Sequence, residues 1–175
     1  AAGAAAGAAA GAAATAAPPR PPEPPPEPEP TVGSVTGLPL PRFAALRDDV
    51  NLRVGPGLRF PIEWTYKRGD LPVEIVREFD QWRRIRDLDG TEGWVSQSAF
   101  RLGRRTFMVR GEQRTLRRTA DDGGVAVARL QPGVVGRLRS CPAGSPWCEV
   151  QVGDLRGWLK RSEVFGVGPD EAIPN

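Results

Sequence analysis

The stretch FDQWRRIRDLDGTEGWV, residues 79–95, decides how the chain folds. Polar and apolar residues alternate on both sides of an Asp89-Gly90 pair, a dipeptide that closes β-hairpins because both positions accept positive φ. The pattern predicts one strand on each side of this turn. An isolated hairpin is only marginally stable in water and cannot bury two tryptophans by itself. The rest of the chain must therefore supply further strands to cover Trp82 and Trp94.

The same arrangement occurs a second time further along the chain. Trp94 follows Leu52 by 42 positions, and Trp158 follows Leu116 by the same 42 positions. Each of these leucines precedes an arginine, and each of these tryptophans follows a glycine. The spacing indicates an internal duplication with an offset of 64 residues, which is long enough for a small domain in each copy.

Both copies consist of short alternating or β-branched runs separated by turn residues. About five short antiparallel strands in each copy suit a small closed or nearly closed barrel, so we expect an all-β protein whose tryptophans lie chiefly in the core. A long loop is expected after the first strand of the first copy. The expected strands cover 50–54, 71–79, 82–87, 92–95 and 105–109 in the first copy, and 113–118, 125–130, 134–141, 147–152 and 155–159 in the second.

Three motifs of the first copy resemble the bacterial SH3-like (SH3b) domain. They are VNLRVGPG at 50–57, the W-x-x-I-R pattern that begins at Trp82, and GWV at 93–95. The resemblance covers residues 46–110. The second copy, 111–168, is similar but degenerate, because RTADDGG replaces the RVGPG segment and we expect a shorter loop after it. The resemblance implies two tandem SH3-like barrels, whereas the strands alone would also permit an OB-fold or another small barrel.

Composition sets the N-terminal segment apart from both copies. Residues 1–17 are nearly all Ala and Gly, and residues 18–30 are Pro with three Glu and one Arg. Neither run offers side chains for a core, and the Pro run is expected to form a polyproline II spacer of roughly 40 Å. We therefore expect 1–37 to be a disordered tether and proline-rich spacer, and 169–175 to be a short tail.

The Ala/Gly run allows three interpretations. Gly3, Gly7 and Gly11 have the G-x-x-x-G spacing of membrane helix dimers, but Ala and Gly are barely hydrophobic and a span requires about 20 strongly apolar residues. A flexible tether fits the composition. The remnant of a signal sequence fits as well, because the chain begins with Ala rather than Met and ATA at 14–16 resembles a small-residue cleavage site.

The two cysteines, Cys141 and Cys148, flank the turn-rich segment PAGSP. The adjoining segments read as strands, so the cysteines are expected to face each other across the mouth of a hairpin, at a separation that a disulfide requires. With two cysteines and no histidine, a structural zinc would lack its four ligands. A disulfide implies an oxidising compartment, and we expect a periplasmic or otherwise extracytoplasmic protein.

The composition argues against catalysis. The chain has no histidine and one tyrosine, which removes the commonest general acid–base groups. No P-loop motif and no strand-led dinucleotide-binding motif occurs, and the paired aspartates are explained by turn chemistry. We therefore expect a non-enzymatic protein without a cofactor or a catalytic metal.

Positive charge concentrates in residues 101–118, where seven arginines meet a single acid, Glu112. One interpretation is a solvated connection between the copies. The other is a surface that attracts an anionic polymer or a membrane. An arginine-rich nucleic-acid-binding barrel therefore stays as the alternative function, although an extracytoplasmic location would argue against it.

We expect a binding protein that acts as a monomer. Its expected partner is a cell-wall polymer or an envelope protein. Some SH3b domains bind peptidoglycan peptides in the region of the corresponding loop, so the resemblance implies a similar site near the long loop of the first copy. Aromatic faces can cover a sugar or a peptide, and arginine pairs with carboxylates. The candidate contacts are Trp64, Tyr66, Trp82 and, for ligand carboxylates, Arg84.

Overall fold

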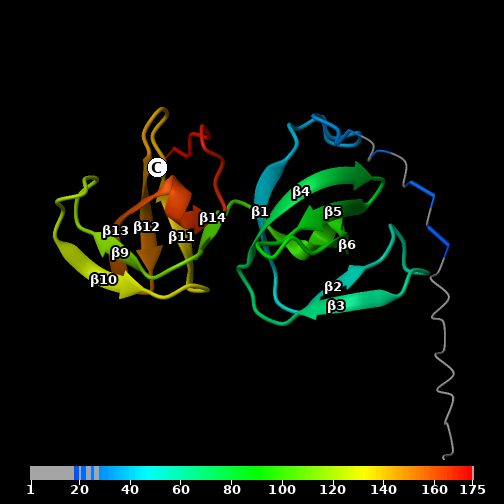
Figure 1. Cartoon of the computed structure of the whole chain (residues 1–175), viewed down its shortest axis with the longest axis horizontal. Helices are drawn as coiled ribbons and strands as arrows, with labels where there is room; N and C mark the ends of the chain where they lie inside the picture. Colours follow the sequence, from blue (N-terminus) through cyan, green and yellow to red (C-terminus); the bar gives the residue numbers. More distant parts are fainter. Residues whose placement is uncertain (1–17, 20, 23–24, 26–27, 175) are drawn as a thin grey trace, which may run out of the picture.

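The computed structural model describes residues 18–19, 21–22, 25 and 28–174, and within them the chain forms two units side by side (Figure 1). Each unit is one antiparallel sheet of seven strands with its own apolar core. The expected all-β class and the tandem arrangement are confirmed. The disorder expected for residues 1–17 lies outside the described residues.

The first sheet has the spatial order β3-β2-β6-β5-β4-β1-β7. A single 3₁₀ turn, η1, joins its last two strands along the chain. The bounds are β1 Arg42–Leu46, β2 Val50–Arg53, β3 Ile62–Tyr66, β4 Pro72–Phe79, β5 Trp82–Arg86, β6 Glu92–Ser96, η1 Gln97–Ala99 and β7 Phe100–Arg101.

The second sheet repeats this order as β10-β9-β13-β12-β11-β8-β14. Each of its elements begins within one residue of 64 positions after its counterpart, so the duplication is confirmed. The bounds are β8 Thr106–Val109, β9 Arg114–Arg117, β10 Ala126–Leu130, β11 Val135–Ser140, β12 Trp147–Val152, β13 Leu155–Lys160, η2 Arg161–Glu163 and β14 Val164–Phe165.

The strand β8 belongs to the second sheet, whereas we expected it to close the first copy at 46–110. It pairs with β11 and β14, and Phe107 and Val109 enter the second core. In the first sheet the corresponding place is taken by β1, which begins upstream of the expected boundary. The boundary between the units therefore lies between β7 and β8. The alternating pattern of β8 predicts a strand, but it cannot say which sheet will pair with it.

The second half of the long loop expected after β2 is a strand. The antiparallel pairing runs from Val50 opposite Tyr66 to Arg53 opposite Ile62, so that only residues 54–61 remain as a loop. Exposed side chains at the start of β3 hid the alternation that would have predicted it. The equivalent loop between β9 and β10 has the same length, and the expected shortening in the second copy does not occur.

The hairpin at 79–95 forms between β5 and β6 as expected, but its turn differs in detail. The N–H of Asp87 donates to the carbonyl of Thr91 at 3.0 Å, and of the three residues between them only Gly90 has positive φ, at 84°. The Asp87 carboxylate accepts the N–H groups of Asp89 and Thr91. The turn is thus a three-residue loop that one glycine and one aspartate hold in place.

Neither core cluster contains a tryptophan, although Trp94 and Trp147 are themselves buried, at 9% and 8% exposure. The prediction that the tryptophans are chiefly core therefore holds only in part. Successive side chains of a strand point to opposite faces. Ile85 and Val95 are fully buried and point inward, which turns Trp82 and Trp94 to the outer face of the same hairpin. The fully buried core residues of the first unit are Leu46, Leu52, Val73, Ile85 and Val95. Those of the second unit include Phe107, Val109, Leu116, Val150, Leu159 and Val164.

Residues 31–40 fold back against the first sheet, so the folded part begins upstream of the expected end of the tether at 37. Val32 forms a β-bridge with Pro39, and the side chain of Leu40 is buried. The hydrogen bonds that hold this segment in place are made to one acidic side chain of β4, that of Glu78.

Glu78 has a fully buried carboxylate that is satisfied from several sides. It accepts the N–H groups of Val35 and Thr36 and the hydroxyl of Thr36, and it pairs with Arg42 at 2.8 Å. Burial by itself would raise the pKa of Glu78, but the hydrogen bonds from Thr36, Arg42 and Val35 outweigh it and lower the pKa to about 2.

We expect Glu78→Gln to make the first unit less stable at neutral pH, by about 3 kcal/mol in the free energy of unfolding. Because the folded pKa lies below the ordinary value of 4.5, the stabilisation is present above that pH and is lost as the pH falls toward 2. Urea unfolding of both proteins at neutral pH and at about pH 3 checks this. Asp154→Asn, at an exposed turn, is the control. An equal difference between Glu78→Gln and the parent at both pH values would contradict it.

The C-terminal residues also pack onto the fold instead of forming a free tail. Ile173 forms a β-bridge with Cys141, and Glu171 pairs with Arg105 at 2.7 Å. The buried Arg161 guanidinium donates to the carbonyls of Ser145, Pro142, Gly168 and Glu171, which fastens this segment to the second unit.

Cys141 and Cys148 form the expected disulfide, with an S–S distance of 2.07 Å and a Cα–Cα distance of 4.3 Å. Both cysteines are fully buried and belong to the second core. The bridge therefore closes the β11–β12 hairpin at the place where Ile173 docks.

The double variant Cys141→Ala/Cys148→Ala should unfold at lower denaturant concentration than the parent. Cross-linking a short loop restricts the unfolded chain and is worth about 2–3 kcal/mol. Urea unfolding is followed by tryptophan fluorescence, to which Trp147 and Trp158 of the second unit contribute together with the three tryptophans of the first unit. The parent in reducing agent should behave as the double variant does, and two reactive thiols in the unreduced protein would show that the bond does not form.

Candidate ligand-binding site

A groove of about 670 Å³ opens beside β3, the edge strand of the first sheet. One wall is β3 itself, and the opposite wall is the turn that connects β5 and β6. Since β3 ends the sheet, no strand of the described chain pairs with its outer edge. The lining residues are Glu63, Trp64, Thr65, Tyr66, Lys67, Arg68, Leu71, Asp87, Asp89 and Thr91.

Trp64 is the exposed aromatic residue of this groove. It lies opposite Leu52, which is fully buried, so its register places it on the core-facing side of the sheet. Its side chain is nevertheless 58% exposed, because the sheet ends at β3 and nothing in the described chain covers it. In the second unit Ala128 takes this position opposite Leu116. The groove is therefore a property of the first unit.

Tyr66 forms the floor of the groove and is buried. Its hydroxyl donates a hydrogen bond of 2.8 Å to Oδ2 of Asp87 in the opposite wall. Burial, followed by this hydrogen bond and the negative charge of Asp87, raises the pKa of Tyr66 well above its ordinary value. The phenol therefore stays a neutral donor and ties β3 to the β5–β6 turn.

Charges of both signs surround the opening. Glu63, Asp87 and Asp89 supply carboxylates, and Lys67 and Arg68 supply cations. The groove can therefore meet a ligand that carries an amine as well as a carboxylate, with Trp64 covering the apolar part between them.

The four candidate contacts separate into two groups. Trp64 and Tyr66 line the groove together, and their contact with a ligand stays a prediction. Trp82 lines a different depression of about 290 Å³, and Arg84 lies on the outer face of the hairpin, paired with Glu92 at 3.0 Å. Alternation along β5 places both side chains on the outer face of the sheet, whereas Trp64 and Tyr66 are in the core-facing register.

Several groove residues were not among the candidates. Lys67 and Arg68 follow β3 directly, and the strand that would have singled them out was taken for a loop. Asp87 and Asp89 were explained by turn chemistry alone. Asp87 does hold the turn, but its carboxylate also accepts a hydrogen bond from the hydroxyl of Tyr66.

The basic segment 101–118 is less open to a polyanion than its composition suggests. Arg101 pairs with Asp48 and Asp70 at 3.0 Å, and Arg104 also reaches Asp70, at 3.3 Å. The guanidinium of Arg105 pairs with Glu171, that of Arg114 pairs with Glu112, and that of Arg117 donates to the carbonyl of Gly124. Most of the seven arginines thus serve the fold.

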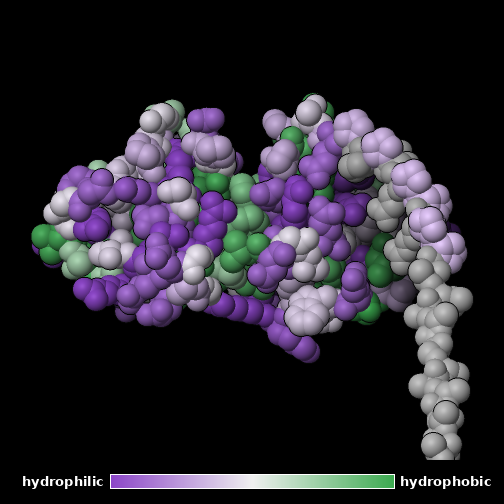
Figure 2. All heavy atoms as spheres, in the orientation of Figure 1, coloured by the Kyte–Doolittle hydropathy of each residue, from purple (hydrophilic) through white to green (hydrophobic). Residues whose placement is uncertain are grey.

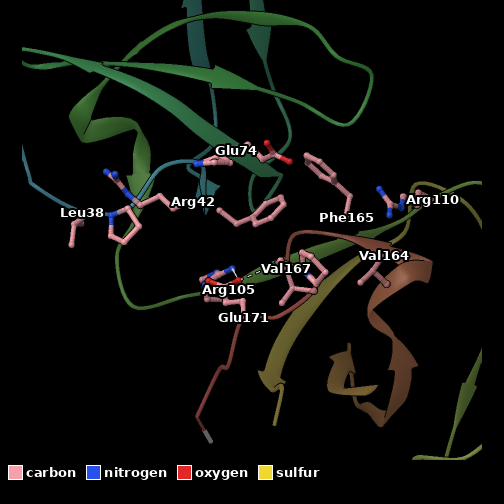
Figure 3. Close-up of a pocket in the computed structure, with 14 residues that line it drawn as sticks. Leu38, Arg42, Glu74, Arg105, Arg110, Val164, Phe165, Val167 and Glu171 are labelled. Carbon is pink, nitrogen blue, oxygen red and sulfur yellow. Dashed lines mark hydrogen bonds and ion pairs between the residues drawn. The ribbon is translucent and has the colours of Figure 1, made fainter. Parts of the chain in front are cut away.

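A second cavity of about 670 Å³ lies where the two units meet (Figure 3). Figure 2 shows apolar side chains gathered at this junction. Phe43 of β1 meets Phe165 of β14 edge to face, with 5.2 Å between the ring centroids, and the Arg105–Glu171 pair closes one side. The cavity is the seam that packs the units together, and no sequence candidate lies in it.

Residues 28–174 and the few described before them hold no group of three side chains that could bind a metal ion. Over the same residues, no helix has the length and apolar character needed to cross a bilayer.

Comparison with known proteins gives one family. The model of the bacterial SH3 domain matches residues 47–101 and again residues 111–166, one match in each unit. No curated protein matches the chain.

Two solved structures are similar at low identity. The structure of NlpC1 from Trichomonas vaginalis is 8% identical, with 76% of this chain and 48% of that chain covered and a TM-score of 0.31. For NlpC2 from the same organism the values are 8%, 73%, 49% and 0.33. The chain thus spans about half the length of either structure.

Tyr66→Phe should lower the free energy of unfolding by about 1–2 kcal/mol, because the Asp87 carboxylate loses a buried donor. In the parent, the contribution of Tyr66 to the free energy of unfolding is fully present below pH 10.0, the ordinary pKa of tyrosine. It falls as the pH rises above that value, because the unfolded phenol ionises there more readily than the folded one. Tyr66 is the one tyrosine of the chain, so ultraviolet absorbance follows it alone. A phenol that titrates normally in the folded protein would contradict the hydrogen bond.

Proposed function

Because the chain belongs to the bacterial SH3 domain family, we propose that it is a non-enzymatic binding module of the cell envelope. Its ligand is a peptide of peptidoglycan, held by the first unit in the groove beside β3. The observation that carries this proposal is Trp64: a large aromatic side chain in a core-facing register, left 58% exposed over a groove. Exposure of this kind is costly for folding and useful for recognition.

The chemistry of the groove fits a short peptide with charges of both signs. Stem peptides of the cell wall carry carboxylates, which Lys67 and Arg68 can meet, and amines, which Glu63 and Asp89 can meet. The unpaired edge of β3 can also take up an extended peptide through backbone hydrogen bonds, as sheet edges do in other peptide-binding domains. Trp64 would then cover the peptide from the side.

The disulfide supports an extracytoplasmic location for this function. Cys141 and Cys148 are bonded and buried, and such bonds persist in oxidising compartments such as the periplasm. The second unit lacks the groove, since Ala128 and Leu130 replace the two aromatic residues. We assign the second unit a scaffolding part, joined to the first through the Phe43–Phe165 contact.

Purified peptidoglycan sacculi should retain the protein at low salt, and Trp64→Ala should weaken retention about tenfold, as loss of an aromatic anchor does in other interfaces. Because charged groups line the groove, retention should fall as the salt concentration rises. The measurement is a pull-down with quantified bound and free protein. Circular dichroism checks that the variant keeps its fold.

Ile62→Ala is the matched control, because Ile62 lies on the same edge strand, is 48% exposed, and does not line the groove. Its retention should equal that of the parent. Equal losses in Trp64→Ala and Ile62→Ala would place the ligand elsewhere. Retention by duplex DNA but not by sacculi would replace the proposal with the nucleic-acid alternative.

A further inference from the structure

A row of polar side chains crosses four neighbouring strands of the second unit. Thr106 on β8 lies opposite Arg137 on β11, Arg137 lies opposite Gln151 on β12, and Gln151 lies opposite Arg156 on β13. Residues directly opposed on antiparallel strands project from the same face of the sheet. Since Phe107, the next residue on β8, is in the core, the row lies on the outer face.

The equivalent row of the first unit neutralises itself. Glu74 lies opposite Arg86, and Arg86 lies opposite Glu92. The Arg86 guanidinium is 3.5 Å from the carboxylate of Glu74 and 3.4 Å from that of Glu92. Glu29, from the segment before β1, reaches the same guanidinium at 3.2 Å. One cation of the sheet therefore meets two carboxylates of the row and a third from outside it.

In the second unit the two carboxylates are replaced by Arg137 and Arg156, and the central cation by Gln151. A third guanidinium, that of Arg139, donates through Nε to Oε1 of Gln151 at 2.8 Å. None of these three arginines has an ion pair among residues 28–174. Desolvation, followed by repulsion from Arg156 and Arg137, lowers the pKa of Arg139. The negative charge of Glu149 opposes this shift without outweighing it. The row itself thus holds like charges and no acid, and no ion pair of the described residues neutralises it.

A groove of about 300 Å³ opens over this row and contains a second unsatisfied group. Thr106, Arg137, Arg139 and Gln151 line it. Thr106 is only 4% exposed, and its hydroxyl oxygen has no hydrogen-bond partner within the described chain. A buried hydroxyl without a partner is unfavourable, and native proteins seldom keep one without a reason.

The groove also contains one acid and one further cation, Asp70 and Arg104, which pair with each other at 3.3 Å. Asp70 is held in addition by Arg101 at 3.0 Å. Its carboxylate is therefore already engaged by two guanidinium groups and does not neutralise the arginines of the row.

We propose that this groove binds a single phosphate group. The donors that line it come from separate strands: the hydroxyl of Thr106 on β8 and the guanidinium groups of Arg137 and Arg139 on β11. A tetrahedral oxyanion accepts hydrogen bonds from several directions, which suits such a set better than a planar carboxylate does. Gln151 is a positioning residue, because its amide accepts from Arg139 and donates to the carbonyl of Gly153 at 2.9 Å.

The size of the groove favours one phosphate over the backbone of a nucleic acid. A duplex is held through many phosphates along an extended basic surface. Here the unpaired cations gather at one place, and the neighbouring arginines 101, 104 and 105 are taken up by ion pairs. The site is also separate from the groove beside β3, so either can fail without the other.

Isothermal titration of the full chain with inorganic phosphate tests the proposal, with chloride at matched ionic strength as the reference. The parent should bind one phosphate, and Arg137→Gln and Arg139→Gln should each weaken binding about tenfold or more, the effect expected for a hydrogen bond to a charged group. Arg129→Gln is the matched control. It removes the same charge from an exposed position on β10 that does not line the groove.

A second variant keeps the test valid if single changes disturb the fold. The triple change Arg137→Glu/Gln151→Arg/Arg156→Glu copies the row of the first unit into the second. It should abolish phosphate binding and raise the melting temperature in phosphate-free buffer, because the row now neutralises itself. A triple variant that still binds phosphate as the parent does would overturn the proposal.

The remaining outcomes are equally definite. The proposal would be overturned if phosphate bound no more tightly than chloride, or if Arg129→Gln lost as much phosphate affinity as Arg137→Gln. Either result would show that the row contributes only general positive charge. Tighter binding of duplex DNA than of phosphate, weakened equally by Arg129→Gln, would indicate a broad polyanion surface instead. Flotation with phosphatidylglycerol vesicles identifies the source: loss of flotation in Arg137→Gln indicates a lipid phosphate, and no flotation beside normal phosphate titration indicates a small soluble ligand.

Discussion

The alternation of side chains along the central hairpin of each unit is the constraint on which the rest of the structure depends. In the first unit, Ile85 and Val95 must point inward to fill the core, and they are fully buried. Because side chains alternate along a strand, this fixes the face of the sheet on which every other residue of β5 and β6 lies. Trp82, Arg84 and Trp94 consequently point to the outer face of the hairpin, where Trp94 is still buried, and the core cluster of this unit contains no tryptophan.

Duplication gave two copies of this constraint and left the outer positions free to diverge. Inward positions such as Leu52 and its counterpart Leu116 stay apolar and fully buried in both units. Outer and edge positions do not stay alike. Ala128 stands where the first unit has Trp64, and a row of unpaired arginines around Gln151 stands where the first unit has an ion-paired row around Arg86. The two units therefore share a fold and offer different surfaces, an aromatic groove on one and a cationic groove on the other.

The chain on both sides of the barrels contributes to their stability. The segment before β1 is fixed by the buried carboxylate of Glu78, and the segment after β14 is fixed by Arg161 and by the bridge of Ile173 to the disulfide. Both segments lie outside the residues that match the bacterial SH3 domain. Each supplies hydrogen-bond partners to charged groups that would otherwise be buried without them.

The sequence by itself determined the all-β class, the duplication at an offset of 64 and the Cys141–Cys148 bond. These follow from periodicity and spacing, which are local properties of the chain. Only the tertiary structure decided which sheet takes β8, and that Arg84 lies away from the groove. Strand partners and ion pairs join residues tens of positions apart, and alternation names the face of a strand but not its neighbour.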